Sequence, residues 1–149
     1  MLQTTDEAPE VTATDHDGEM VTLSFAEPTV LYFYPRDDTP GCTVEAQEFD
    51  AELAAYRDAG VAVYGVSTDD AGSHATFREK YDLNVDLLAD PDGEVAATFG
   101  VPIKGGAADR VTYVLAEGEV KRLYRGVDPD GHARDVLRDL ADEGIVAVE

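Results

Sequence analysis

The alternation of apolar and polar residues predicts a β-hairpin followed by two buried strands. Residues 11–14 and 20–23 alternate in polarity on either side of the turn residues 15–18, the pattern of a hairpin with a tight turn. Residues 29–34 (TVLYFY) and 61–67 (VAVYGVS) are nearly unbroken runs of β-branched and aromatic residues. Such runs are typical of central strands that are covered on both faces.

A helix is predicted after each of the two buried strands. Thr39 can cap the first helix, and Pro40 fits its first position because the missing N–H would be unpaired there anyway. Apolar residues recur on one face of this helix until residues 58–60 end it: Ala46, Phe49, Leu53 and Tyr56. The second helix covers residues 71–81. This succession of strand, helix, strand and helix predicts parallel pairing in an α/β fold.

The second half of the chain predicts smaller elements. They are a strand at 86–89, a turn at 90–93, a short helix at 94–99, a hairpin of 110–115 with 120–124, and a closing helix at 133–141. No repeat, linker or low-complexity stretch interrupts them. With 149 residues the chain has the length of one compact domain, 1–149, with a core of its own.

The net charge of the chain limits the classes of molecule that it is expected to bind. Eleven basic residues against 32 acidic ones leave a net charge of −21, and only three of the basic residues are lysines. This charge makes nucleic acid an unlikely partner. We interpret the acidity as adaptation to a salty cytosol, where screening lets like charges coexist; the alternative is a solvated acidic surface without special meaning.

Residues 1–9 have no basic or apolar stretch, and the chain has no apolar run long enough to span a membrane. We therefore expect a cytoplasmic protein. The one cysteine, Cys42, excludes an intramolecular disulfide and a Cys-rich zinc site. A buried structural thiol, an intermolecular bridge and a nucleophile remain open.

The segment 34–42 contains most of the chemical information. It begins at the end of a predicted strand and finishes in the first turn of a helix, and functional groups of open α/β sheets gather beyond the carboxyl ends of strands. A helix N-terminus carries partial positive charge and favours a thiolate, the nucleophilic form of cysteine. Gly41 allows a close backbone approach. The local sequence is equally consistent with a small buried hydrophobic residue at Cys42.

The same residues resemble a known family, the peroxiredoxins, and within it the peroxiredoxin Q or bacterioferritin comigratory protein group. The matching signature is P-x-x-x-T-x-x-C at Pro35, Thr39 and Cys42, preceded by the aromatic strand. Residues 88–101 and 110–115 (RVTYVL) are similar to two further segments of the family. Spaced motifs in the right order are far more specific than one short pattern.

The resemblance implies a thioredoxin-like fold with a central mixed sheet, helices on both faces and an N-terminal hairpin. It also implies an antioxidant peroxidase without a cofactor or metal. Cys42 would be the peroxidatic nucleophile, which becomes a sulfenic acid. Thr39 would hydrogen-bond the peroxide, Pro35 would shield the sulfur from water, and Arg110 would stabilise the thiolate and the charge on the leaving oxygen.

Three neighbours of this set have open roles. Glu45 is a candidate to hold Arg110, although a solvated helix carboxylate is the default expectation at such a position. Arg36 could add a second positive charge near the sulfur, but Asp37 and Asp38 beside it can neutralise that charge. We therefore leave Arg36 out of the predicted site.

The sequence departs from the family at one position. Many members carry a resolving cysteine five residues after the nucleophile, where this chain has Gln47. We therefore expect a one-cysteine mechanism on hydrogen peroxide and organic hydroperoxides. An external thiol, either a small molecule or a thioredoxin- or glutaredoxin-like protein, would reduce the sulfenic acid, or a second subunit's Cys42 would. The protein would be a monomer or a homodimer.

Other functions compete with this interpretation. A thioredoxin-like domain can be a catalytically silent binding module or a cysteine redox sensor, but retention of Thr39 and Arg110 beside Cys42 argues against lost chemistry. A Cys–His hydrolase is remote, because the three histidines lie in a predicted turn, helix and C-terminal loop without a motif: His16, His74 and His132. A metal site is weaker still, because no cluster has ligand spacing.

Overall fold

A computed structural model describes residues 1–126, 128–142 and 144. Seven strands form the main sheet: β1 (Val11–Asp15), β2 (Met20–Leu23), β3 (Thr29–Phe33), β4 (Ala62–Ser67), β5 (Asp86–Ala89), β8 (Val111–Ala116) and β9 (Glu119–Arg125). A two-stranded sheet contains β6 (Ile103–Lys104) and β7 (Ala107–Ala108). The helices are α1 (Pro40–Asp58), α2 (Ala71–Tyr81), α3 (Glu94–Phe99) and α4 (His132–Asp142).

The main sheet is mixed, with the order β2-β1-β5-β4-β3-β8-β9. The pairs β3/β4 and β4/β5 are parallel, since α1 and α2 carry the chain back across the sheet between them. The pairs β3/β8 and β1/β5 and the two hairpins are antiparallel. β3 lies in the interior of the sheet, between β4 and β8, and is buried along all five residues, as its apolar run predicted.

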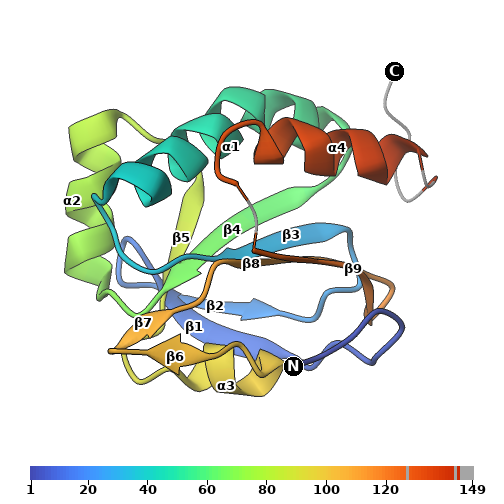
Figure 1. Cartoon of the computed structure of the whole chain (residues 1–149), viewed down its shortest axis with the longest axis horizontal. Helices are drawn as coiled ribbons and strands as arrows, with labels where there is room; N and C mark the ends of the chain where they lie inside the picture. The colour runs from blue at the N-terminus through green and yellow to red at the C-terminus, as the bar shows by residue number, and fades with distance from the viewer. Residues whose placement is uncertain (127, 143, 145–149) are drawn as a thin grey trace.

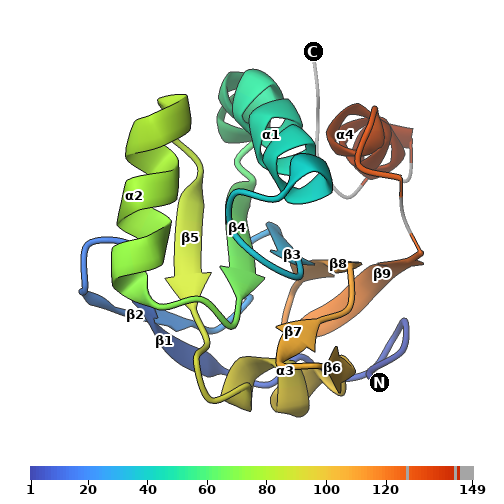
Figure 2. The same ribbon diagram turned by 60° about the vertical axis from the view of Figure 1, so that its left-hand side comes forward.

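Helices cover both faces of the sheet, which confirms the predicted layers. In two views α1, α2 and α4 lie on one side, and α3 lies on the other with the small β6–β7 sheet (Figures 1 and 2). Successive residues of β3 point to opposite faces, so Val30 and Tyr32 join the core under α1 and α4. Leu31 and Phe33 join the core under α3.

Three local details differ from the predictions. Thr39 has the extended backbone of an N-cap, but its side chain does not cap α1. Its hydroxyl donates instead to the backbone oxygen of Arg36 at 3.1 Å. α4 begins at His132, so the prediction that this histidine lies in a loop was wrong. The β6–β7 sheet was not predicted, because two-residue strands are too short to show alternation.

No helix among the described residues is long and apolar enough to cross a membrane.

Candidate active site

Cys42 lies in the first turn of α1, beyond the carboxyl end of β3. The loop of residues 34–39 leaves β3, and Pro40 begins the helix. Only 2% of Cys42 is exposed, and it belongs to the apolar core between α1 and the sheet. The structure therefore combines burial with a position where backbone N–H groups lack helical partners. Burial alone does not distinguish the structural thiol from the nucleophile.

Arg110, which directly precedes β8, approaches this sulfur from another part of the chain. Its Nη2 donates to Cys42 Sγ at 3.4 Å, across 68 positions of sequence. The contact follows from sheet register, because Val111 at the start of β8 pairs with Phe33 at the end of β3. Arg110 is therefore held beside the loop that leads from β3 to Cys42. This geometry brings together the nucleophile and the cation that the resemblance implied.

Glu45 holds the other half of the guanidinium. Arg110 Nη1 donates to Glu45 Oε1 at 2.5 Å, and Glu45 is completely buried. Three residues after Cys42, Glu45 lies on the same face of α1. The default expectation of a solvated carboxylate was wrong. The candidate role of Glu45 in holding Arg110 matches its position.

Burial and ion pairing shift the pKa values of Glu45 and Arg110 in opposite directions. Burial raises the pKa of Glu45 to about 7, although Arg110 beside it acts to lower that pKa. Burial by itself would lower the pKa of Arg110, but Glu45 and Cys42 outweigh it, and the net effect is a raised pKa. Arg110 therefore remains a cation beside the sulfur. Its partner carboxylate can take up a proton near neutral pH.

Gly41 leaves room for the Arg110 side chain. A Cβ at position 41 would lie 3.2 Å from Arg110 Nη2 and 3.7 Å from Cγ of Pro129. The first distance is too short for an ordinary contact, so a larger residue would displace the guanidinium. Gly41 thus allows the close approach expected from the sequence, and the group that approaches it is the side chain of Arg110.

Pro35 and Thr39 lie in the 34–39 loop. Pro35 is half-buried just beyond β3, and Thr39 directly precedes α1. Because the Thr39 hydroxyl donates to the Arg36 carbonyl, its lone pairs can accept a hydrogen bond from a ligand. Arg36 itself is exposed, and its Nη2 donates to the Gly105 backbone oxygen at 3.2 Å. That contact directs it to the β6–β7 turn and supports leaving it out of the site.

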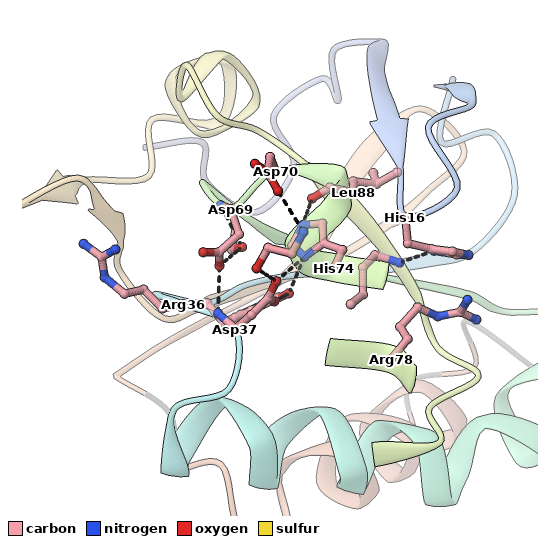
Figure 3. A network of polar contacts seen from close by, with 12 residues as sticks. His16, Arg36, Asp37, Asp69, Asp70, His74, Arg78 and Leu88 are labelled. Carbon is pink, nitrogen blue, oxygen red and sulfur yellow. Dashed lines mark hydrogen bonds and ion pairs between the residues drawn. The ribbon is translucent and has the colours of Figure 1, made fainter. Parts of the chain in front are cut away.

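Two residues around this loop, Asp37 and His74, had no predicted role in the site. Asp37 lies inside the loop, and its Oδ2 is 2.8 Å from Nδ1 of His74, which is completely buried on α2 (Figure 3). The spacing of His74 and Phe77, three residues apart, could have placed His74 on the buried face of α2. No motif around it pointed to the loop.

One group of described residues could offer ligands to a metal ion, namely Asp15, His16 and Asp17. Their potential ligand atoms lie within 4.8 Å of one another. The Asp15 carboxylate already accepts from two backbone N–H groups of its own turn, and His16 Nδ1 accepts from Leu87 N. These contacts account for the cluster as the closed turn of the β1–β2 hairpin.

Comparison with known proteins identifies relatives that all belong to one family. Residues 4–123 match the model of the AhpC/TSA family. The chain is 42% identical over 136 residues to "Peroxiredoxin Q, chloroplastic" of Triticum aestivum, covering 87% of this chain and 63% of the relative. It is 36% identical over 140 residues to "Putative peroxiredoxin bcp" of Coxiella burnetii, covering 87% and 93%. The chain thus spans less than two thirds of the wheat protein.

Solved structures agree with these sequence relatives. Peroxidoxin BcpB from Mycobacterium tuberculosis superposes with a TM-score of 0.88 at 31% identity, covering 95% of this chain and 98% of that one. A cysteine-to-serine mutant of PrxQ from Xylella fastidiosa gives a TM-score of 0.90 at 27% identity, covering 97% and 98%. The thioredoxin-like fold implied by the resemblance is confirmed.

Proposed function

The chain belongs to the AhpC/TSA family, as a relative of peroxiredoxin Q and bcp proteins, and on this premise we propose that it is a thiol-dependent peroxidase. Its substrates are hydrogen peroxide and organic hydroperoxides, and its nucleophile is Cys42. One observation carries the proposal: Arg110 Nη2 donates to the buried Sγ of Cys42 at 3.4 Å, at the start of a helix. A structural thiol has no need of such a cation.

In the first step the Cys42 thiolate attacks the terminal oxygen of the hydroperoxide. An S–O bond forms and the O–O bond breaks, so the sulfur is oxidised by two electrons to a sulfenic acid. The other oxygen leaves with the electron pair as an alkoxide, or as hydroxide from hydrogen peroxide, and takes a proton from water. Arg110 stabilises the thiolate and then this growing negative charge, an interaction that strengthens toward the transition state.

Thr39 and Pro35 contribute to the same step. The Thr39 hydroxyl donates to the Arg36 carbonyl, which leaves its lone pairs to accept the O–H of the bound peroxide. Pro35 presents an apolar ring without an N–H and shields the sulfur from water. With Cys42 and Arg110 these residues are the proposed catalytic set. Glu45 positions Arg110 without touching the substrate.

The sulfenic acid is reduced by an external thiol. Position 47, where a resolving cysteine would lie, is an exposed glutamine, and the 149 residues contain no second cysteine. A first external thiol displaces the sulfenic oxygen as water and forms a mixed disulfide with Cys42. A second external thiol then releases the reduced enzyme and a disulfide of the reductant. A small thiol or a thioredoxin- or glutaredoxin-like protein fits this scheme.

The unpaired thiol and the net charge bear on the compartment and the salt concentration in which the enzyme works. We propose a cytoplasmic enzyme, because a reducing compartment keeps an unpaired catalytic thiol reduced. The net charge of −21 supports adaptation to high salt, which lowers the repulsion between the acidic groups. Because salt screens this repulsion, the free energy of unfolding should rise between low and molar potassium chloride. A monomer or a homodimer is compatible with the proposed mechanism.

Peroxide consumption and intact mass test the proposal. Reduced protein is mixed with one equivalent of hydrogen peroxide, beside a Cys42→Ser variant and an Arg110→Ala variant. We expect rapid gain of one oxygen, no gain in the serine variant and a slower gain in the alanine variant. A Cys42 that reacts no faster than free cysteine would contradict the proposal and favour a binding module. Oxidation without turnover in the presence of any thiol would favour a redox sensor.

A further inference from the structure

Resting on this proposed function, we propose that Asp37 and His74 form a buried carboxylate–imidazolium pair that positions the 34–39 loop for the peroxide step. Both are positioning residues, because the loop they hold carries Pro35 and Thr39. His74 is completely buried on α2, and the Asp37 side chain is 4% exposed within the loop (Figure 3). The inference follows from the hydrogen-bond partners of the two side chains.

The two ring nitrogens of His74 both face acceptors. Nε2 lies 2.9 Å from the backbone oxygen of Leu88, which has no proton to donate, so Nε2 carries a hydrogen. Nδ1 lies 2.8 Å from Asp37 Oδ2. The Tyr34 hydroxyl is 3.4 Å from Nδ1, but it donates to Asp37 Oδ1 at 2.6 Å and so does not supply the hydrogen for this nitrogen. In a neutral ring with hydrogen on Nε2, the lone pair of Nδ1 would face a carboxylate oxygen, which is repulsive. A second ring hydrogen removes this conflict and makes the ring an imidazolium.

The partners of Asp37 favour its ionised form. Its Oδ1 accepts from the hydroxyl of Tyr34 at 2.6 Å, and its Oδ2 accepts from the hydroxyl of Ser73 at 2.7 Å. With His74, three donors surround one carboxylate. A buried charge pair is costly unless its hydrogen bonds are satisfied, and here both members have theirs. The pair is therefore stable as a unit and sensitive to the loss of either member.

This pair connects the loop to α2 and not to the helix of the nucleophile. Asp37 N also donates to Asp69 Oδ2 at 2.7 Å, just before α2, and Asp38 accepts from Lys80 Nζ of α2 at 2.6 Å. The Asp38–Lys80 ion pair is exposed, whereas the Asp37–His74 contact is buried. Cys42 and Arg110 are held by a separate contact, through Glu45. Loss of the Asp37–His74 contact should therefore displace Pro35 and Thr39 while the contact of sulfur with guanidinium remains.

Two substitutions of His74 separate its two hydrogen bonds. The amide nitrogen of asparagine can take the place of Nδ1 and donate to Asp37, whereas that of glutamine takes the place of Nε2 and donates to Leu88 O. His74→Gln therefore loses the contact with the loop, and His74→Asn keeps it. His16→Gln is the matched control, because His16 is also buried and bonds β5, through Leu87 N at 3.3 Å, without touching the loop.

The rate constants of Cys42 with hydrogen peroxide and with iodoacetamide are measured for each protein. Alkylation needs the thiolate but not the loop, so we expect the peroxide rate of His74→Gln to fall about tenfold or more while its alkylation rate stays near that of the wild type. In His74→Asn and His16→Gln the ratio of the two rates should stay near that of the wild type. A general loss of structure would expose the buried Cys42, raise its alkylation rate as the peroxide rate falls, and overturn the inference.

The wild-type protein provides two further outcomes. Nitrogen NMR at pH 7 should show both ring nitrogens of His74 protonated, and an unprotonated Nδ1 would overturn the inference even if no variant folds. A fast wild-type peroxide rate with an unchanged ratio in His74→Gln would overturn the positioning role alone. A wild-type rate no faster than that of free cysteine would instead contradict the proposed peroxidase function.

Discussion

The guanidinium of Arg110 donates one hydrogen bond to Cys42 Sγ at 3.4 Å and a second to the buried carboxylate of Glu45. Cys42 and Glu45 belong to the same helix, whereas Arg110 precedes β8. The arginine thus bridges two residues of one helical face from the start of β8, a distant part of the chain. Its position beside the sulfur depends on the shape of the fork as well as on its charge.

Lysine should therefore fail to replace Arg110. Arg110→Lys retains a positive charge but cannot reach the sulfur and the carboxylate together, because an ammonium lacks the planar fork. We expect its rate of Cys42 oxidation by hydrogen peroxide to fall by roughly tenfold to a hundredfold, close to that of Arg110→Ala. Stopped-flow peroxide kinetics measure this. A lysine variant with the wild-type rate would show that charge alone is sufficient.

Gly41→Ala should slow the same reaction. The added Cβ would lie 3.2 Å from Arg110 Nη2, so the guanidinium must move away from its place beside the sulfur. We expect a several-fold lower peroxide rate, with little loss of stability, because alanine suits a helix better than glycine. Gly72→Ala is the control, since its Cβ would meet only Asp70 Oδ1, at 3.5 Å. Equal rates in the two variants would contradict the crowding of Arg110.

Glu45 should make the stability depend on pH. Its pKa rises from 4.5 to about 7 in the folded protein, so between these values the folded state keeps a proton that the unfolded state releases. The free energy of unfolding therefore falls as pH rises through this window, by up to about 3 kcal/mol. In Glu45→Gln this component is absent. Urea unfolding at pH 4 to 8 checks it, and parallel profiles for both proteins would refute it.

His132 should make the free energy of unfolding depend on pH in the opposite direction. Burial lowers its pKa from 6.5 to about 4, and its Nε2 bonds the hydroxyl of Thr112 at 2.9 Å. Between these values the unfolded state binds a proton that the folded state excludes, so stability contributed by His132 is lost as pH falls through the window, by up to about 3 kcal/mol. Urea unfolding should show a weaker acid destabilisation in His132→Gln. The same acid slope in both proteins would exclude His132 as its source.

The order of apolar and polar residues along the chain was sufficient to predict β3 and α1. The run of β3 predicted a central strand, and Pro40 with the apolar spacing after it predicted α1 with both of its bounds. Cys42 was therefore expected in the first turn of a helix, where the structure has it. These features depend on neighbours within one or two helical turns, so they are present in the order of the residues themselves.

Only the tertiary structure decided the surroundings of the sulfur. From sequence, Glu45 resembled a solvated helix carboxylate, and its burial follows from the packing of α1 on the sheet and from the register that sets Val111 beside Phe33. The Asp37–His74 contact joins residues 37 positions apart, through the packing of α2. Periodicity specifies which face of an element is buried. It does not specify which distant side chain meets that face, because that depends on strand register and helix packing across the whole fold.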